Sequence, residues 1–232
     1  MAAIYKKEIY GYLRSAAGYV FAGVYLAIYA YFFMTYNIAG DNADIGSLLE
    51  NGVAAFILLI PILTMRLFAE EKHSKTSFVY LCAPLKTHQI ILGKYFAALT
   101  VFAVSSLIVP VSGAIMVFFK GQTAMEVVCV FLGYLLVGAA FIAAGMLMSS
   151  FAENQVISAI LSFFVLLILY FADLLLEAAS GTVFENVIKL VSVSYHYKNL
   201  LAGIFDIGAA VYFLSLAALF VSFTILKTEG ER

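Results

Sequence analysis

The sequence predicts an all-α membrane protein that forms a single domain over residues 1–232 and crosses a lipid bilayer six times. Hydrophobic residues make up 64% of the chain and charged residues only 12%. A soluble domain usually carries about 25% charged residues, because its surface must be polar. With half that share, this chain cannot cover itself with polar side chains. Lipid is therefore its expected solvent.

Six long apolar runs supply the expected spans. A helix that rises 1.5 Å per residue needs about 20 apolar residues to cross the hydrocarbon layer. The runs meet or approach this length, and the third exceeds it, which predicts a helix that tilts or protrudes from the membrane. The spans are expected at about 19–38, 52–68, 90–119, 124–149, 156–176 and 207–226.

The basic residues between these runs are sorted by side, which predicts the orientation. When loops are assigned alternately to the two sides, only Lys120, Lys189 and Lys198 fall on one side. The loops of a membrane protein that face the cytosol carry the excess of Lys and Arg. The richer side, which includes both termini, is therefore expected in the cytosol. It holds Lys6, Lys7, Arg14, Arg66, Lys72, Lys75, Lys86, Lys94, Lys227 and Arg232.

Residues 2–17, ahead of the first span, have the pattern of an amphipathic helix. Apolar side chains recur at helical spacing on one face, and Lys6, Lys7 and Arg14 lie elsewhere. Such a helix lies along the headgroups with its basic residues toward anionic lipid. The expected apolar face comprises Tyr5, Ile9, Tyr12, Leu13 and Ala16.

Prolines and small residues predict features inside the spans. Pro61 and Pro110 are expected to kink the second and third spans, because proline removes a backbone donor. The fourth span carries small residues at spacings that let helices approach closely. Packing within the chain and association of subunits both explain this pattern. These residues are Gly133, Gly138, Ala140, Ala144 and Gly145.

The loop at 69–88, between the second and third spans, combines charge with a short apolar helical stretch. Glu70, Glu71, Lys72, Lys75 and Lys86 surround that stretch, which Pro84 ends, and Ser74 or Thr76 is placed to cap its start. A short helix of this kind is too polar to insert and too apolar to remain free in water. Docking on a cytosolic partner and a merely solvated loop both remain open.

The same loop resembles that of the ABC-2 type permeases, and most closely the subgroup of gliding-motility and related exporters. Their loop commonly reads Phe-Ala-Glu-Glu-Lys-Arg-x-Gly-Thr, and this chain departs from it at His73-Ser74-Lys75. The resemblance extends over nearly the whole chain. It rests on Phe68-Ala69-Glu70-Glu71-Lys72, on Ala83-Pro84-Leu85, on 89–95, on Gly18-Tyr19-Val20-Phe21, on Asn154-Gln155 and on Tyr212-Phe213-Leu214.

The resemblance implies a role for each part of the chain. Residues 2–17 would form an elbow helix, the loop at 69–88 a coupling helix that enters a groove of a separate cytosolic ATPase, and 178–206 short extracellular helices. It also implies export and a pair of permease subunits, identical or related. The expected ATPase contacts are Glu70, Glu71, Lys72, Ser74 and Thr76.

No motif in the chain indicates chemistry of its own. Gly93-Lys94 lacks the GxxxxGK[ST] pattern that holds nucleotide phosphates, so ATP and Mg²⁺ are expected only on the partner ATPase, and this chain is not expected to be an enzyme. No basic stripe with interleaved aromatic residues suggests nucleic acid as a partner. Membrane lipid is the other expected partner.

Two acids near the outer end of the fifth span, Asp173 and Glu177, are candidates for the transport path or an outer gate, although plain solvation is favoured. Three other functions remain open: an ion-coupled transporter or channel, a membrane-embedded enzyme acting on lipid, and a membrane anchor for an ATPase that moves nothing.

Overall fold

The computed structural model describes residues 1–39, 45–74, 86–120, 123–178, 192–201 and 206–230. The residues in these ranges form helices and no strand. In chain order the helices are α1 (Ala2–Arg14), α2 (Ala16–Phe32), the π-helix η1 (Phe33–Ala39), α3 (Ile45–Thr64), α4 (Ala69–His73), α6 (Thr87–Ser105), α7 (Ile108–Lys120), α8 (Ala124–Phe151), α9 (Gln155–Ala178), α11 (Val193–Leu201) and α12 (Ile207–Glu229).

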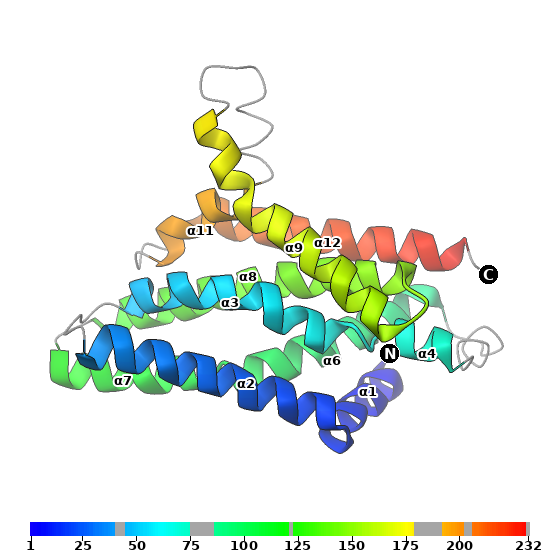
Figure 1. Cartoon of the computed structure of the whole chain (residues 1–232), viewed down its shortest axis with the longest axis horizontal. Helices are drawn as coiled ribbons and strands as arrows, with labels where there is room; N and C mark the ends of the chain where they lie inside the picture. Colours follow the sequence, from blue (N-terminus) through cyan, green and yellow to red (C-terminus); the bar gives the residue numbers. More distant parts are fainter. Residues whose placement is uncertain (40–44, 75–85, 121–122, 179–191, 202–205, 231–232) are drawn as a thin grey trace.

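Six stretches of helix are long and apolar enough to cross a membrane, which confirms the predicted fold class. They are Ala16–Ile38, Leu48–His73, Thr87–Phe119, Ala124–Phe151, Gln155–Ala172 and Ile207–Glu229. The long helices run roughly side by side, and the N- and C-termini lie at the same end of the bundle (Figure 1). A membrane would therefore lie across the long axis of the picture, with both termini on one side.

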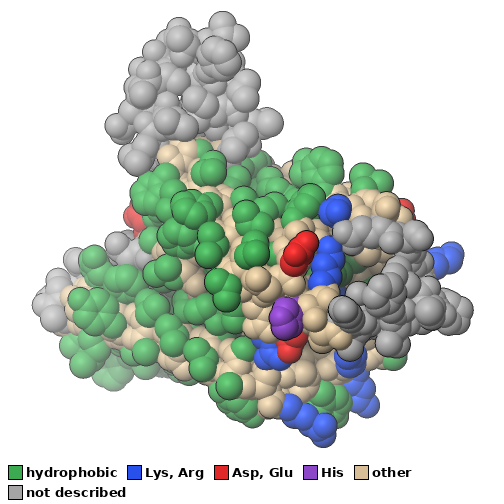
Figure 2. All heavy atoms as spheres, turned by 45° about the vertical axis from the view of Figure 1, so that its right-hand side comes forward, with side chains coloured by type: hydrophobic (Ala, Val, Ile, Leu, Met, Phe, Trp, Pro, Cys, Tyr) green, Lys and Arg blue, Asp and Glu red, His purple; other side chains and the backbone are tan. Residues whose placement is uncertain are grey.

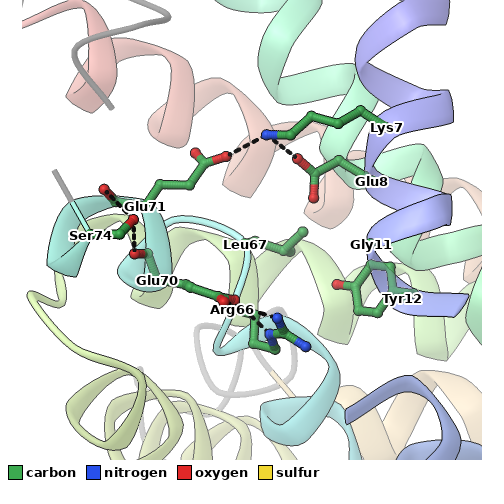
Figure 3. A pocket seen from close by; sticks show the side chains of 9 residues that line it. All are labelled: Lys7, Glu8, Gly11, Tyr12, Arg66, Leu67, Glu70, Glu71 and Ser74. Atoms are coloured by element: carbon green, nitrogen blue, oxygen red, sulfur yellow. Dashed lines mark hydrogen bonds and ion pairs between the residues drawn. The ribbon is translucent and has the colours of Figure 1, made fainter. Parts of the chain in front are cut away.

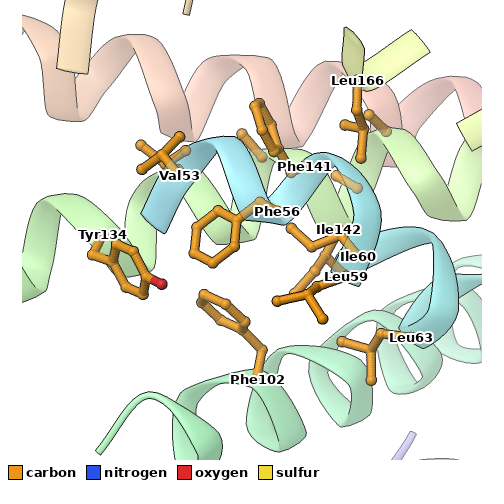
Figure 4. Close-up of a cluster of buried hydrophobic side chains, with 14 of the residues drawn as sticks. Val53, Phe56, Leu59, Ile60, Leu63, Phe102, Tyr134, Phe141, Ile142 and Leu166 are labelled. Atoms are coloured by element: carbon orange, nitrogen blue, oxygen red, sulfur yellow. The ribbon is translucent and has the colours of Figure 1, made fainter. Parts of the chain in front are cut away.

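Helix α8 is the centre of the bundle. It packs against α3, α6, α7, α9, α11 and α12, and most of its side chains are buried. Aromatic rings fill the space around it: the Phe56 ring centroid lies 4.6 Å from that of Tyr134 and 5.2 Å from that of Phe102 (Figure 4). Ring pairs at these separations add to the stabilisation that burial alone provides. The core thus binds three spans, α3, α6 and α8, into one unit.

The third span is interrupted close to Pro110, where the sequence predicted a kink. It ends as α6 at Ser105 and begins again as α7 at Ile108. Pro110 explains the position, because it has no N–H to donate to the carbonyl of Ser106, four residues earlier, and its ring clashes with that carbonyl. The Ser106 carbonyl instead accepts the N–H of Val109 at 3.0 Å. By contrast, α3 continues through Pro61.

Other boundaries differ from the sequence pattern where polar residues begin or end a helix. Helix α3 starts at Ile45, ahead of the expected position 52, because its first turns include polar residues that hydropathy alone excludes. Of the expected coupling loop at 69–88, the structure describes α4 and the start of α6; positions 75–85 lie outside the described residues. Of 178–206, it describes chiefly α11.

Helix α1 packs along α6 and leaves part of its predicted apolar face exposed, as a face toward lipid would be. Ile4 and Tyr12 are buried, whereas Leu13, which was expected on the same apolar face, is exposed. The sequence pattern did not include Ile4. Its place next to Gly93 of α6, where an added Cβ would lie 3.2 Å from the Ile4 Cβ, shows how closely the two helices approach. The role of α1 as an elbow helix stays a prediction.

The small residues of α8 lie against other helices of the same chain. A Cβ added at Gly138 would lie 2.3 Å from Phe102 of α6, and one at Gly145 would lie 2.4 Å from Thr64 of α3. Gly133 faces Leu200 of α11 in the same way. Packing within the chain therefore accounts for these three glycines, which was one of the two explanations of the pattern.

We expect Gly138→Val to destabilise the bundle, because Phe102 is fully buried against Phe56 and cannot move aside. Overpacking of this kind costs about 1–3 kcal/mol. Thermal melting of the detergent-solubilised chain measures the loss. Gly23→Val is the matched control, since nothing lies within 4 Å of a Cβ at Gly23. Equal melting temperatures for the two variants would contradict the close approach of α6 and α8.

Candidate functional site

The basic residues whose side chains the structure describes lie at the end of the bundle that holds both termini. We call this the basic end; it carries Lys6, Lys7, Arg14, Arg66, Lys72, Lys86, Lys94 and Lys227. Figure 2 brings this end forward and shows Lys and Arg side chains grouped there, whereas hydrophobic side chains cover the visible side of the bundle. The sorting inferred from the loops thus holds in three dimensions for these residues.

Lys94 is the centre of a group of charges that joins three elements of the basic end. Its side chain is 1% exposed, and its Nζ lies 2.8 Å from Glu71 Oε1 of α4 and 3.3 Å from Glu8 Oε1 of α1. The Nζ also donates to the backbone carbonyl of Leu67 at 2.5 Å. A buried ammonium group is tolerable only when charged and polar partners surround it. Lys94 therefore holds α1, α4 and α6 together.

Lys7 closes this group from the solvent side. Its Nζ lies 3.4 Å from Glu71 Oε1 and 3.7 Å from Glu8 Oε1, and its side chain is mostly exposed. Glu8 and Glu71 are each only 15% exposed. The two carboxylates thus lie between a buried cation and an exposed one. We call Lys7, Glu8, Glu71 and Lys94 the charge cluster.

A second ion pair fixes the chain between α3 and α4. Arg66 donates to Glu70 through two nitrogens, Nε at 2.6 Å and a terminal nitrogen at 2.9 Å. Such a two-point contact sets the orientation of both side chains. Because the pair is partly exposed, its main effect is positional, and its contribution to stability is small.

Helix α4 is also attached to the end of α8. The hydroxyl of Ser149 accepts the backbone N–H groups of Phe68 and Ala69, at 3.1 and 3.3 Å. The first N–H groups of a helix have no partner within the helix, so this hydroxyl acts as a cap supplied by another element. In addition, Lys72 Nζ donates to the carbonyl of Ser150 at 2.6 Å. Five residues of helix are thereby held from two sides.

A cavity of about 230 Å³ lies between α1 and α4, beside the charge cluster (Figure 3). Tyr12 lines this cavity. Its hydroxyl donates a hydrogen bond to the carbonyl of Leu63 at 2.7 Å, which gives a partner to one of the last carbonyls of α3. Burial, with a smaller effect from Glu8, raises the pKa of the Tyr12 phenol above its usual range, so the hydroxyl stays neutral and remains a donor.

The structure brings together four of the residues expected at the ATPase contact. Glu70, Glu71 and Lys72 lie on α4, and Ser74 follows it, with its hydroxyl on the carbonyl of Glu70 at 2.8 Å. Thr76 lies outside the described residues. Contact of these residues with an ATPase stays a prediction. Within the chain, Glu71 contacts Lys94 of α6, and Lys72 contacts the Ser150 carbonyl of α8.

The two candidate acids of the fifth span are not part of this site. Asp173 and Glu177 belong to the last turns of α9. Their side chains lie outside what the structure describes. A role in the transport path stays a prediction for both.

Three residues of the site were missed by the sequence pattern: Glu8, Lys94 and Ser149. For two of them, Glu8 and Lys94, the sequence held a signal. Glu8 is an acid within an otherwise basic N-terminal helix, and Lys94 falls within the apolar run expected to form the third span. A charge inside a span usually has a partner on a neighbouring element. Ser149 gave no such signal, because serine is common in helices that pack closely.

The fold and the site define a class: a polytopic α-helical membrane protein whose short polar helix at the basic end is joined to several spans. The chain matches the family model described as ABC-2 family transporter protein over residues 5–227. It therefore belongs to the ABC-2 family of transporter proteins, and it is a membrane component of the ABC transporter type. A search of curated proteins found no match.

Proposed function

We propose that this chain is the permease subunit of an ATP-driven ABC exporter whose ATPase is a separate polypeptide. Membership of the ABC-2 family supports a transport role and, in general, an ABC ATPase partner. The observation that carries the proposal further is the attachment of α4 to α1, α6 and α8 through the charge cluster, Ser149 and Lys72. A short polar helix held in this way can pass a displacement on to the spans.

The ATPase would contact α4 and the residues that follow it. Glu70, Glu71, Lys72, Ser74 and Thr76 are the proposed contacts, and ATP and Mg²⁺ would bind to the partner alone. When two ATPase subunits close on ATP, α4 would move with them. Lys94 would pass that movement to α6, and Ser149 and Lys72 would pass it to α8. The coupling requires that ATP bind one arrangement of the complex more tightly than the other.

The basic end would face the cytosol in this arrangement, with both termini inside the cell and the chain in the cell membrane. The distribution of Lys and Arg supports this orientation. A second copy, or a related permease, would complete a path between the two subunits. The apolar and aromatic character of the spans favours an amphipathic or lipidic cargo.

An ion-coupled transporter is less well supported. Such proteins place charged groups near the middle of the membrane. Among the side chains that the structure describes, Lys94 is the only buried Asp, Glu, Lys or Arg, and it lies at the basic end. A membrane anchor that moves nothing would share the fold. Cargo movement by the reconstituted permease and ATPase would distinguish an ABC permease from such an anchor.

Labelling tests the orientation. We expect a cysteine at Ser74, which is exposed, to react with a membrane-impermeant maleimide in inverted vesicles and to be protected in intact cells. Cys82 and Cys129 are first replaced, so that the signal comes from position 74. Met125→Cys, exposed at the start of α8, is the control and should react in intact cells. Reaction of position 74 from outside would invert the orientation and remove the ATPase contact.

Binding to the ATPase is the second test. A tagged permease, expressed in its native cells, should retain an ABC ATPase through purification. The complex should also hydrolyse ATP at a rate that depends on the permease. An intact, correctly oriented permease that binds no ABC ATPase would contradict the proposal.

A further inference from the structure

A groove of about 270 Å³ lies at the basic end between α1, α2 and α6, on the side of α1 away from the charge cluster. Its walls are almost entirely apolar and include Ile9 and Leu13 of α1, Tyr19 and Ala22 of α2, and Val101 and Val104 of α6. Leu13, Tyr19 and Val104 are exposed large side chains of its rim. In a chain that spans a bilayer, a groove with such a rim opens toward lipid.

The groove exists because α1 and α2 meet at a sharp angle. The chain becomes extended at Ser15, with φ −102° and ψ 147°, and then begins α2. Gly18 permits the close approach that follows, since a Cβ there would lie 2.4 Å from the carbonyl oxygen of Tyr12. The hollow is thus set by the backbone of the turn, and a change of side-chain rotamers alone would not close it.

An exposed row of side chains that includes two basic residues runs along α1 beside the residues that line the groove. Lys6, Tyr10 and Arg14 are spaced four residues apart on α1, so they form one row along the helix, next to the row of Ile9 and Leu13 that lines the groove. All three are exposed, and the Arg14 guanidinium lies 5.8 Å from the centre of the Tyr10 ring. An apolar groove with cations along its edge matches a lipid that carries an acyl chain and an anionic headgroup.

We propose that this groove binds an anionic phospholipid, with one acyl chain between α1, α2 and α6 and the phosphate beside Lys6 and Arg14. The lipid would hold α1 against the first and third spans. This binding does not depend on the ATPase, so the proposal goes beyond the proposed function and can fail separately from it.

Tryptophan fluorescence provides the test, because the chain contains no Trp and an introduced one reports alone. Tyr19→Trp places the reporter on the rim of the groove. Tyr31→Trp is the matched control: it lies on the same helix, is equally exposed at 65%, and does not line the groove. Each variant is reconstituted in phosphatidylcholine vesicles that contain increasing fractions of brominated phosphatidylglycerol or brominated phosphatidylethanolamine, since bromine quenches a nearby Trp.

We expect phosphatidylglycerol to quench Trp at position 19 at a mole fraction at least about fivefold lower than phosphatidylethanolamine, since a single basic residue near an anionic surface already provides a factor of about five. At position 31 the two lipids should quench equally. The preference at position 19 should vanish with Lys6→Gln and Arg14→Gln together, and weaken with either alone. Ala22→Phe, which fills the groove, should also remove it.

Equal quenching by the two lipids at position 19 would overturn the proposal, and so would a preference that survives loss of both charges. A preference of the same size at position 31 would show general attraction of anionic lipid and would overturn it as well. Because Lys6 and Arg14 are exposed, their variants should fold normally, which gel filtration in detergent checks.

Discussion

Lys94→Met is expected to lower the free energy of unfolding of the solubilised chain by about 3–5 kcal/mol, the usual cost of removing one partner from a buried ion pair. Methionine keeps much of the shape of lysine, so the change removes mainly the charge and its hydrogen bond. Glu8 and Glu71 would lose the cation between them, and the carbonyl of Leu67 would lose its donor. Thermal melting in detergent measures the effect.

Lys86→Met is the matched control for this prediction. Lys86 lies on the same side of the protein, two turns before Lys94, and is exposed, so its loss should change stability by less than about 0.5 kcal/mol. Adding Glu71→Gln to Lys94→Met should recover part of the loss, because one uncompensated carboxylate is removed. Equal stability of the Lys94 and Lys86 variants would show that the charge cluster does not hold α1, α4 and α6 together.

Glu71→Lys is expected to abolish co-purification of the ATPase while the chain still inserts into the membrane. In the structure, Glu71 lies between Lys7 and Lys94, so the substitution would bring three ammonium groups together and displace α4 from α6. Like charges at this separation repel strongly where water is scarce. Affinity purification of the complex measures the result, with the permease in the membrane fraction as the measure of insertion.

Two further variants separate a positional role of Glu71 from a direct contact with the ATPase. Arg66→Gln breaks the ion pair with Glu70 and leaves the charge cluster in place, and Arg66 is not a proposed ATPase contact, so this variant should reduce co-purification far less. Combining Glu71→Lys with Lys94→Glu restores opposite charges and should recover part of the complex. Undiminished co-purification in the single Glu71→Lys variant would contradict the coupling role of α4.

The six spans could be predicted because hydropathy is a local property of the sequence. A run of apolar residues of sufficient length crosses the membrane whatever its neighbours are. The break at Ser106 was harder to place, although Pro110 was recognised. A proline interrupts the bond to the residue four positions earlier, and the surrounding packing decides whether the helix ends there, as in the third span, or continues, as at Pro61.

The charge cluster could not be predicted, because its members are far apart in the sequence. Glu8 and Lys94 are separated by 86 positions, and a single sequence gives no sign of which distant charges meet. Lys94 was therefore recognised only as a basic residue of the cytosolic side and as part of Gly93-Lys94, which lacks the phosphate-binding pattern. Similarly, Glu71 was recognised in the loop motif, but its contact with Lys94 of α6 depends on how α4 packs at the basic end of the bundle.

The interruption between α6 and α7 has a consequence for alternating access. The α6 half is tied to the basic end by Lys94 and by the hydrogen bond between Thr100 and Tyr5, whereas the α7 half is tied to α2 by the bond between Ser112 and Tyr29. Because no regular helix joins the halves at Ser106, the proposed transport movement could tilt the α6 half without carrying the α7 half with it. A passage lined by this span could thus open in one leaflet while it stays closed in the other.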